Sequence, residues 1–317
     1  MKKLSIIIPM MNEEDGIDIL FRRLIPIISG LELDYEIICV NDGSVDGTLS
    51  KLIEKRKSNC KIHIIDLSRN FGKEAALMAG IEHATGECLI PLDADLQDPP
   101  ELIPEMIYKW QLGAEVVLAV RERRRSDSWI KRTSANMFYS TINKLSDIPI
   151  PSNAGDFRLI DRKVVFALRR LPERNRFNKG IFAWLGFKTE ILTYERPERE
   201  AGQTKWKFRQ LWSFALDGIT SFSSWPLRVW SYIGLAIATA SLMYALITVI
   251  RVIFFDDIHL PGYASIITAI MFSTGVILIS LGVIAEYLSR IFIEVKSRPL
   301  YIIRDIYDQN SPSNTHD

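Results

Sequence analysis

The chain has 317 residues, which is enough for one or two domains with a substantial hydrophobic core. Its 39 lysines and arginines nearly balance 38 aspartates and glutamates, so the bulk charge does not favour nucleic acid as a partner. The three cysteines are an odd number and the four histidines are scattered along the sequence, so we expect neither a disulfide framework nor a zinc site.

Residues 1–200 alternate between short apolar runs rich in β-branched residues and longer segments with helical periodicity. Strands are predicted at 4–8, 35–40, 61–67, 88–92 and 116–120, and helices at 14–28, 48–57, 73–84 and 100–111. This alternation is typical of a mostly parallel sheet with helices on both faces. The fold class of this part is therefore α/β, and such sheets bind ligands at the carboxyl ends of their strands.

Polar side chains follow four of these predicted strands. They are Asn12 and Glu13 after the first strand, Asn41 and Asp42 after the second, Arg69 and Asn70 after the third, and Asp93 and Asp95 after the fourth. Each pair alone is typical of a helix cap or a turn. Four strand ends that converge on polar residues favour a binding site.

The segment after the fourth strand suggests a metal site. Asp93 and Asp95 are separated by one residue, so on extended backbone their carboxylates point the same way. Two carboxylates beside the amide oxygen of Gln97 suit Mg²⁺ or Mn²⁺, and these ions usually share their coordination with substrate phosphates. We therefore predict a site for a nucleotide diphosphate, with a solvated turn as the structural alternative.

A cluster of basic residues follows the fifth predicted strand. Four arginines occur within residues 121–125, and Lys131 and Arg132 come shortly after them. A run of like charges is typical of a solvated face, and it also suits contact with an anionic lipid.

Two uncharged apolar stretches, residues 229–250 and 264–285, are each long enough to cross a bilayer, which takes about 20 residues. A short acidic link at 256–262 separates them. We predict a transmembrane hairpin with spans at about 229–253 and 264–288; the alternative is a pair of buried helices in a soluble protein. Basic residues flank the hairpin, so both termini and the α/β part are predicted to face the cytoplasm.

Residues 206–225 mix aromatic and basic side chains directly before the first predicted span. This composition is typical of an amphipathic helix in the membrane interface, and packing against the α/β part is the alternative. The predicted organisation is thus an α/β domain at 1–200, an interfacial segment at 201–228, a two-span hairpin at 229–289 and a cytosolic tail at 290–317.

In this order, the motifs resemble those of membrane-bound polyprenyl-phosphate glycosyltransferases of the GT-A, family-two type. The chain looks most like bacterial and prophage bactoprenol glucosyltransferases, with dolichol-phosphate mannose synthases as more distant relatives. The segments that carry the resemblance are Asn12-Glu13-Glu14, Asn41-Asp42-Gly43-Ser44, Arg69-Asn70-Phe71-Gly72-Lys73, Asp93-Ala94-Asp95-Leu96-Gln97, Gly155-Asp156-Phe157-Arg158, Gly202-Gln203-Thr204-Lys205-Trp206 and Pro226-Leu227-Arg228.

The resemblance implies a Rossmann-like GT-A domain in a multi-pass protein of the bacterial inner membrane. The implied reaction is inverting transfer of glucose from UDP-glucose to undecaprenyl phosphate, for O-antigen or another envelope glycan. The implied partners are the UDP-sugar, the lipid phosphate, the bilayer and further copies of the chain in a homotetramer, and the implied cofactor is Mg²⁺ or Mn²⁺. Open alternatives are a different sugar, of the aminoarabinose or mannose type, and a non-catalytic membrane scaffold that binds nucleotide.

The resemblance also implies roles for individual residues. For the nucleotide these residues are Pro9, Asn12, Glu13, Asp42, Asn70, Lys73 and Asp93. Asp95 and Gln97 are implied as metal ligands, and the catalytic residues are Asp93, Asp95 and Asp156. The acceptor phosphate is assigned to Arg121, Lys131, Arg132 and Lys205.

Two positions depart from the family pattern. Met11 stands where the family often has phenylalanine or tyrosine, so a stacking contact with the base is expected to be missing. Asn41 stands where many relatives have an acid, and we expect that this position does not ligate metal.

Overall fold

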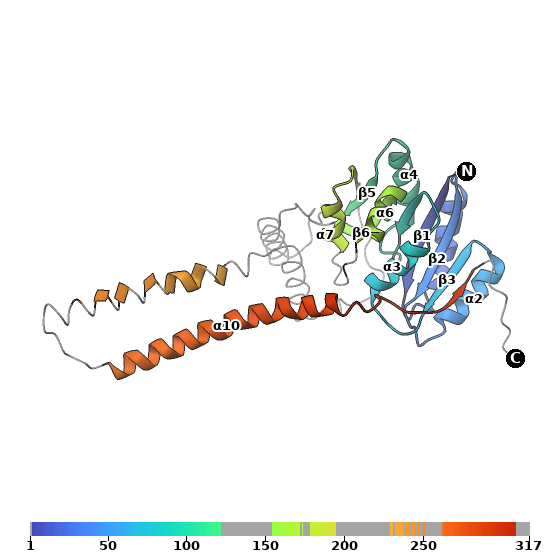
Figure 1. Cartoon of the computed structure of the whole chain (residues 1–317). Helices are drawn as coiled ribbons and strands as arrows, with labels where there is room; N and C mark the ends of the chain where they lie inside the picture. The colour runs from blue at the N-terminus through green and yellow to red at the C-terminus, as the bar shows by residue number, and fades with distance from the viewer. Residues whose placement is uncertain are drawn as a thin grey trace. The chain divides into compact units, whose positions relative to one another are not determined.

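The computed structural model describes residues 2–121, 154–171, 173, 178–194 and 262–308, and part of 229–250. The strands and helices predicted within residues 4–120 are all present, with bounds that differ by a few residues (Figure 1). In chain order the elements are β1 Lys3–Met10, α1 Ile17–Ser29, β2 Asp34–Asn41, α2 Thr48–Ser58, β3 Ile62–Leu67, α3 Lys73–His83, β4 Cys88–Pro91, η1 Pro100–Leu102, α4 Ile103–Gln111, β5 Val116–Arg121, β6 Ala154–Asp161, α6 Arg162–Arg169, α7 Asn178–Leu185, β7 Thr189–Tyr194, α10 Tyr263–Val295 and β8 Ile303–Tyr307.

The described strands form one eight-stranded sheet in the order β7-β5-β6-β4-β1-β2-β3-β8. The four central strands β4, β1, β2 and β3 run parallel to one another, and β5 runs parallel to β7. Strand β6 runs antiparallel to both β4 and β5, and β8 runs antiparallel to β3. The sheet is therefore mixed, with the predicted parallel arrangement at its centre.

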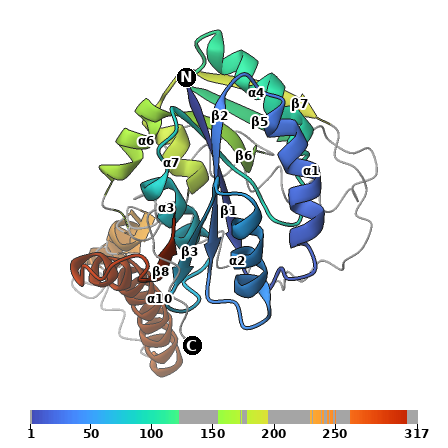
Figure 2. The same ribbon diagram turned by 90° about the vertical axis from the view of Figure 1, so that its right-hand side faces the viewer.

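Helices cover both faces of this sheet (Figure 2). On one face, side chains of α1, α2 and α4 share one buried cluster with Ile6 and Ile8 of β1. On the other face α3 packs closely against β1. A Cβ atom at Gly80 of α3 would lie only 2.3 Å from Ile7 Cγ2, so the close approach requires glycine. Alternate β1 side chains thus face opposite helical layers, as the period of two in a strand requires. Burial on both faces explains why β1 reads as a continuous apolar run.

Strand β8 was not predicted. Residues 290–317 were predicted to form a cytosolic tail, whereas residues 303–307 pair with β3 and form an edge of the sheet. Its sequence offers a weak signal, because a five-residue strand with only its end residues half-buried lacks a long apolar pattern. Residues 296–302 connect it to α10.

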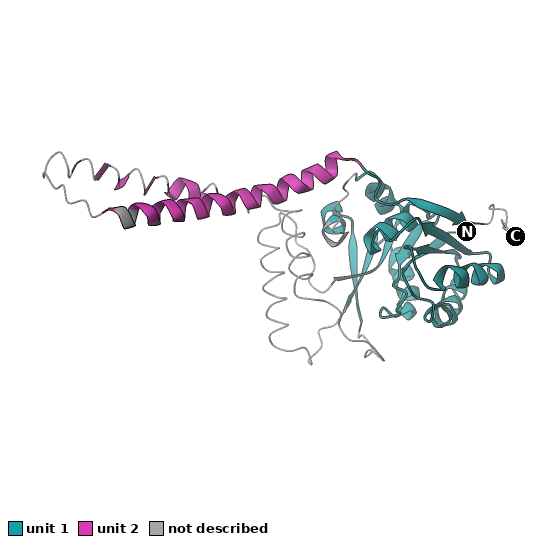
Figure 3. Ribbon diagram, turned by 90° about the horizontal axis from the view of Figure 1, so that it is seen from below, with its two compact units in different colours: residues 1–140, 148–207, 298–317 teal, residues 141–147, 208–297 magenta. Residues whose placement is uncertain are grey.

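The chain divides into two compact units (Figure 3). Unit 1 comprises residues 1–140, 148–207 and 298–317, and unit 2 comprises residues 141–147 and 208–297. Within unit 2, residues 269–295 of α10 contain an 18-residue stretch with a mean hydropathy of 2.0, and none of that stretch is buried. In the described residues this is the helix with the length and composition of a membrane span. Residues 229–250 are described only in part, so the two-span hairpin stays a prediction.

Candidate functional site

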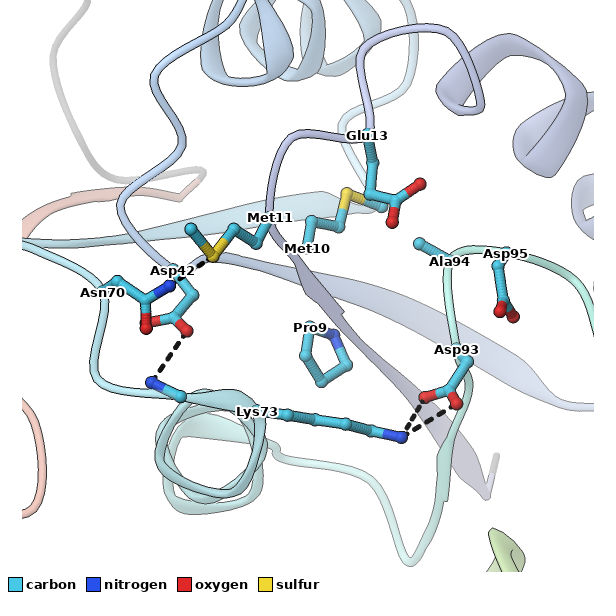
Figure 4. A pocket seen from close by; sticks show the side chains of 11 residues that line it. Pro9, Met10, Met11, Glu13, Asp42, Asn70, Lys73, Asp93, Ala94 and Asp95 are labelled. Carbon is cyan, nitrogen blue, oxygen red and sulfur yellow. Dashed lines mark hydrogen bonds and ion pairs between the residues drawn. The ribbon is translucent and has the colours of Figure 1, made fainter. Parts of the chain in front are cut away.

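A cavity of about 290 Å³ lies at the carboxyl ends of β1, β2 and β4 and at the start of α3 (Figure 4). Its lining residues come from four separate segments of unit 1. They are Pro9, Met10, Met11, Glu13, Asp42, Asn70, Gly72, Lys73, Asp93, Ala94 and Asp95. Of the strand-end residues expected to converge, Glu13, Asp42, Asn70, Asp93 and Asp95 meet here, because parallel strands direct their carboxyl ends to one edge of the sheet. The other three, Asn12, Asn41 and Arg69, do not line the cavity.

Asp42 joins two of the loops that form the cavity. Its buried carboxylate accepts hydrogen bonds from the backbone N–H groups of Phe71, at 2.7 Å, and Gly72, at 2.9 Å. The turn after β2 also presses against the loop after β3, since a Cβ at Gly43 would lie 2.5 Å from the backbone of Arg69. Gly43 has a φ of +69°, a conformation that glycine adopts at little cost. These contacts fix the position of Asp42 at the cavity wall.

Lys73 and Asp93 form an ion pair across the cavity. The Lys73 Nζ lies 2.7 Å from one carboxylate oxygen of Asp93 and 2.8 Å from the other. Lys73 is the first residue of α3 and Asp93 follows β4, so the pair connects two strand-end loops (Figure 4). Both side chains are partly exposed, so a phosphate that enters the cavity can compete for the ammonium group.

Asp95 lies in a tight turn beyond Asp93. Its carboxylate accepts hydrogen bonds from the backbone N–H of Gln97, at 3.1 Å, and from Gln97 Nε2, at 2.5 Å. Leu96, between them, has a φ of +52°, which belongs to the left-handed region. Gln97 turns its amide nitrogen toward Asp95, so the implied ligation of a metal through the amide oxygen requires the amide to rotate.

The charges of the cavity favour a cation. Four carboxylates, those of Glu13, Asp42, Asp93 and Asp95, line it with the single ammonium of Lys73. A nucleotide diphosphate would be repelled by this balance unless additional positive charge entered with it. Among the described residues no three His, Cys, Asp or Glu side chains are grouped as a metal cage. The donor set therefore fits a hard ion such as Mg²⁺ or Mn²⁺, which uses one or two carboxylates together with substrate phosphates.

Glu13 and Asn12 follow β1 and differ in their placement. Glu13 lines the cavity, and its backbone N–H donates to Thr48 Oγ1 at 2.9 Å. Asn12 is not among the lining residues, and its side-chain oxygen accepts from the backbone N–H of Val45 at 2.9 Å. In turn the Asn12 backbone N–H donates to Ser44 Oγ at 3.0 Å. Asn12 thus joins the loops after β1 and β2, and its predicted contact with nucleotide is not seen in the cavity lining.

The pKa of Glu13 lies above its ordinary value, first because burial disfavours the charged form and then because Asp95, Asp46 and Asp93 repel it. A divalent cation favours the ionised carboxylate, so its binding lowers this pKa and releases a proton. We expect the affinity for Mn²⁺ with UDP to rise with pH through the range just above the ordinary glutamate pKa. Calorimetry at about pH 5 in buffers of different ionisation enthalpy measures the proton release. Equal release from Glu13→Gln would contradict this assignment.

The opposite end of the cavity is less charged. Pro9 and Met11 come from the end of β1, and Asn70 comes from the loop after β3. The amide nitrogen of Asn70 contacts the sulfur of Met11, whose side chain is 42% exposed. Its flexible thioether presents an apolar surface without the flat ring of a phenylalanine or tyrosine. Sequence reasoning did not identify Met10, Gly72 and Ala94 as lining residues, because such side chains carry no chemical signal.

The remaining predicted site residues cannot be placed in the cavity. The backbones of Asp156 and Arg121 belong to β6 and β5, and their side chains are outside the described part of the structure. Lys131, Arg132 and Lys205 lie outside the described residues altogether. The assignments of an acceptor phosphate site and of Asp156 as a catalytic residue therefore stay predictions.

Strand-end acids beside a lysine, on a mixed sheet covered by helices, define a site of the kind that nucleotide-dependent transferases use. A model of glycosyl transferase family 2 matches residues 5–168, and a model of the GtrB C-terminal hairpin matches residues 225–291. The chain belongs to glycosyl transferase family 2, and its core is a GT-A-like mixed α/β sheet.

Relatives match over nearly the whole chain. An uncharacterized glycosyltransferase of Synechocystis sp. is 53% identical over 305 residues and covers 96% of both chains. A prophage bactoprenol glucosyl transferase homolog of Escherichia coli is 45% identical, with 96% of this chain and 99% of the relative covered. The bactoprenol glucosyl transferase of Shigella phage SfX is 46% identical, with 95% and 99% covered.

A solved structure is also similar. It is glucosyl-3-phosphoglycerate synthase from Mycobacterium tuberculosis in complex with Mn²⁺, uridine diphosphate and phosphoglyceric acid. The TM-score is 0.48 at 18% sequence identity, and the match covers 69% of this chain and 76% of that one.

Proposed function

We propose that this protein transfers glucose from UDP-glucose to undecaprenyl phosphate and inverts the anomeric centre. The observation that carries the proposal is the cavity with Lys73, Asp93 and Asp95 in a chain 45% identical, over 96% of its length, to a prophage bactoprenol glucosyl transferase homolog. The product would be a lipid-linked phosphoglucose that supplies O-antigen or another envelope glycan.

The chemistry of the acceptor explains why a site without a strong base is sufficient. A phosphate monoester oxygen is already an anion at neutral pH, so it can attack C1 of the sugar without first losing a proton. None of the residues that line the described cavity is a histidine. In-line attack opposite the leaving diphosphate converts an α-linked donor into a β-linked product. Asp156 would then orient a sugar hydroxyl or the acceptor, with no obligatory role as a base.

The work left for the protein is electrostatic. Lys73 would turn from Asp93 toward the diphosphate and stabilise the negative charge that develops on the leaving group. Asp95, with Asp93 and Gln97 beside it, would hold Mg²⁺ or Mn²⁺, which neutralises phosphate charge when bound. Pro9, Met11 and Asn70 would contact the base and ribose at the less charged end.

The acceptor is a membrane lipid, and the second unit fits that requirement. The exposed apolar helix α10 would cross the bilayer, paired with a first span at 229–253 and preceded by an interfacial helix at 201–228. The catalytic domain and both termini would face the cytoplasm of a bacterial inner membrane. Arg121, Lys131, Arg132 and Lys205 would hold the lipid phosphate, and a homotetramer is the proposed assembly.

A donor panel tests the proposed function. The purified protein is incubated with Mg²⁺ or Mn²⁺, undecaprenyl phosphate and one nucleotide sugar at a time. The lipid product is identified by its mass in a mass spectrometer. We expect a hexosyl product from UDP-glucose and none from other sugars. A product from an aminoarabinose or mannose donor would change the substrate, and no product from any donor with a folded protein would favour a nucleotide-binding scaffold.

A further inference from the structure

Residues 302–304, which follow α10, form hydrogen bonds with the first residue of the loop after β3, and this loop lines part of the cavity. Ser68 directly follows β3, and its backbone N–H donates to the carbonyl of Ile302 at 2.9 Å. The backbone carbonyl of Ser68 accepts a hydrogen bond from Arg304 Nη2 at 2.7 Å. Both backbone hydrogen-bonding groups of Ser68 are therefore held by residues 302–304. Four residues further along the loop, Gly72 lines the cavity.

A register shift in the pairing of β8 with β3 accompanies the contact of Arg304 with Ser68. Asp66 pairs with Asp305 and Leu67 pairs with Ile303, so the register shifts and Arg304 lies between two paired residues. A β-bulge of this kind redirects a side chain and is often found beside a functional site. In a regular ladder Arg304 would have a partner opposite it on β3.

Arg304 also contacts a buried acid. The Asp66 side chain is 1% exposed, and one of its carboxylate oxygens lies 3.4 Å from Arg304 Nη1. The other oxygen accepts from Asn41 Nδ2 at 2.7 Å. Asn41 and Asp66 are direct cross-strand partners of β2 and β3, and both are buried. A buried carboxylate is costly unless it is paired and hydrogen-bonded, so these contacts depend on one another.

The same contacts reach the other cavity loop. Asn41 Oδ1 accepts from the backbone N–H of Ser44 at 3.3 Å, which shapes the turn that contains Asp42. Asp42 in turn holds the N–H groups of Phe71 and Gly72. The turn after β2 and the loop after β3 are thus connected by one hydrogen-bond network that contains Asn41, Asp66 and Arg304. The asparagine at position 41 donates to Asp66, whereas an aspartate there would place a second carboxylate against it.

We propose that Arg304 is a positioning residue for the nucleotide donor, acting through Ser68 and Asp66 on the two loops that carry Asn70 and Asp42. The inference rests on the proposed function, because it assigns the strand after the membrane helix to the donor site of that same reaction. Arg304 does not line the cavity, and its proposed role is to hold the loops in the geometry that binds UDP.

A second arginine on the same edge provides a matched control. Arg56, on α2, donates from Nη2 to the backbone carbonyl of Asp308, directly after the end of β8. Replacing Arg56 loosens the strand at its other end and leaves Ser68 and Asp66 untouched. A role of Arg304 in strand docking alone predicts the same defect from both replacements.

The test is UDP binding to the full-length protein in the presence of Mn²⁺, measured by calorimetry for the wild type, Arg304→Met, Arg304→Lys and Arg56→Met. We expect Arg304→Met to raise the Kd about tenfold, the size of effect that a coupling network carries. We expect Arg304→Lys to restore part of the affinity and Arg56→Met to bind as the wild type does. In the donor assay the Arg304→Met defect should appear in KM for UDP-glucose more than in kcat.

Three outcomes would overturn the inference. Unchanged UDP affinity of a folded Arg304→Met protein would overturn it while leaving the proposed function intact. An equal loss of UDP affinity in Arg56→Met would show that Arg304 serves only to dock strand β8. A wild-type protein that binds no UDP would overturn the proposed function and the positioning role together. Hydrogen exchange of residues 68–73 without nucleotide gives an independent check, and faster exchange in Arg304→Met than in Arg56→Met is expected.

Discussion

Asp95→Ala is expected to lower kcat for sugar transfer by about 10²- to 10³-fold, the cost typical of losing one electrostatic contact to a transition state. Asp95 lies exposed on the cavity wall and accepts hydrogen bonds from Gln97 in its own turn. Its removal takes away a carboxylate that, in the proposed function, would hold a divalent ion beside the leaving diphosphate. The initial rate of lipid-linked product at saturating donor and metal measures the effect.

Asp15→Ala is the matched control for this variant. Asp15 is an exposed acid in the loop after β1 and does not line the cavity. Activity should persist in the control, and thermal unfolding of both variants should stay close to that of the wild type, because neither side chain is part of the core. Full activity of Asp95→Ala at limiting Mn²⁺ would show that this carboxylate has no part in metal or donor binding.

Lys73→Met is expected to lower kcat by about 10²-fold and to weaken UDP binding about tenfold, because an ammonium that faces phosphate stabilises both bound and developing negative charge. The variant also leaves Asp93 without the ammonium that lies 2.7 Å from it. The cavity then holds four carboxylates and no lysine, so an anionic donor meets stronger repulsion. Steady-state kinetics and UDP titration separate the two effects.

Two further variants sharpen this result. Lys73→Arg keeps the charge and should recover part of the activity, although a planar guanidinium is not equivalent to a compact ammonium. Lys61→Met removes a surface ion pair with Asp34, of similar exposure, at the start of β2 and β3. If Lys61→Met lost as much activity as Lys73→Met, the loss would reflect surface charge in general and the role of Lys73 would be wrong.

The fold of unit 1 could largely be predicted because its signal is local. Apolar runs that are buried on both faces, as β1 is, differ in pattern from amphipathic helices such as α1. The directions of the strands outside the parallel centre of the sheet were harder to predict. The antiparallel β6 and β8 follow long connections, and their pairing depends on contacts between distant residues that no local pattern records.

The site could be predicted in outline for a similar reason. Residues that follow parallel strands meet at one edge, and this rule alone brings Glu13, Asp42, Asn70, Asp93 and Asp95 to the cavity. The rule fails for Asn12, whose side chain is used by the neighbouring turn. It also cannot show the ion pair of Lys73, which depends on where α3 begins relative to β4.

Asn41 and Asp66 show where sequence reasoning ends. Asn41 was expected not to ligate metal, and it lies buried against Asp66 outside the lining of the cavity. Identifying its partner requires the register of β2 and β3, which pairs the two residues directly. Register is a property of the assembled sheet, so a pair of polar side chains 25 positions apart gives no signal in the sequence.

The anomeric configuration of the lipid product tests the central claim most directly. The protein is incubated with UDP-glucose, undecaprenyl phosphate and Mn²⁺, and the coupling of the anomeric proton in the purified lipid is measured by nuclear magnetic resonance. Direct attack of the lipid phosphate on the α-linked donor predicts a β-linked glucosyl phosphate. An α-linked product would contradict single-step transfer, and the absence of any glucosylated lipid from a folded, UDP-binding protein would contradict the proposed reaction itself.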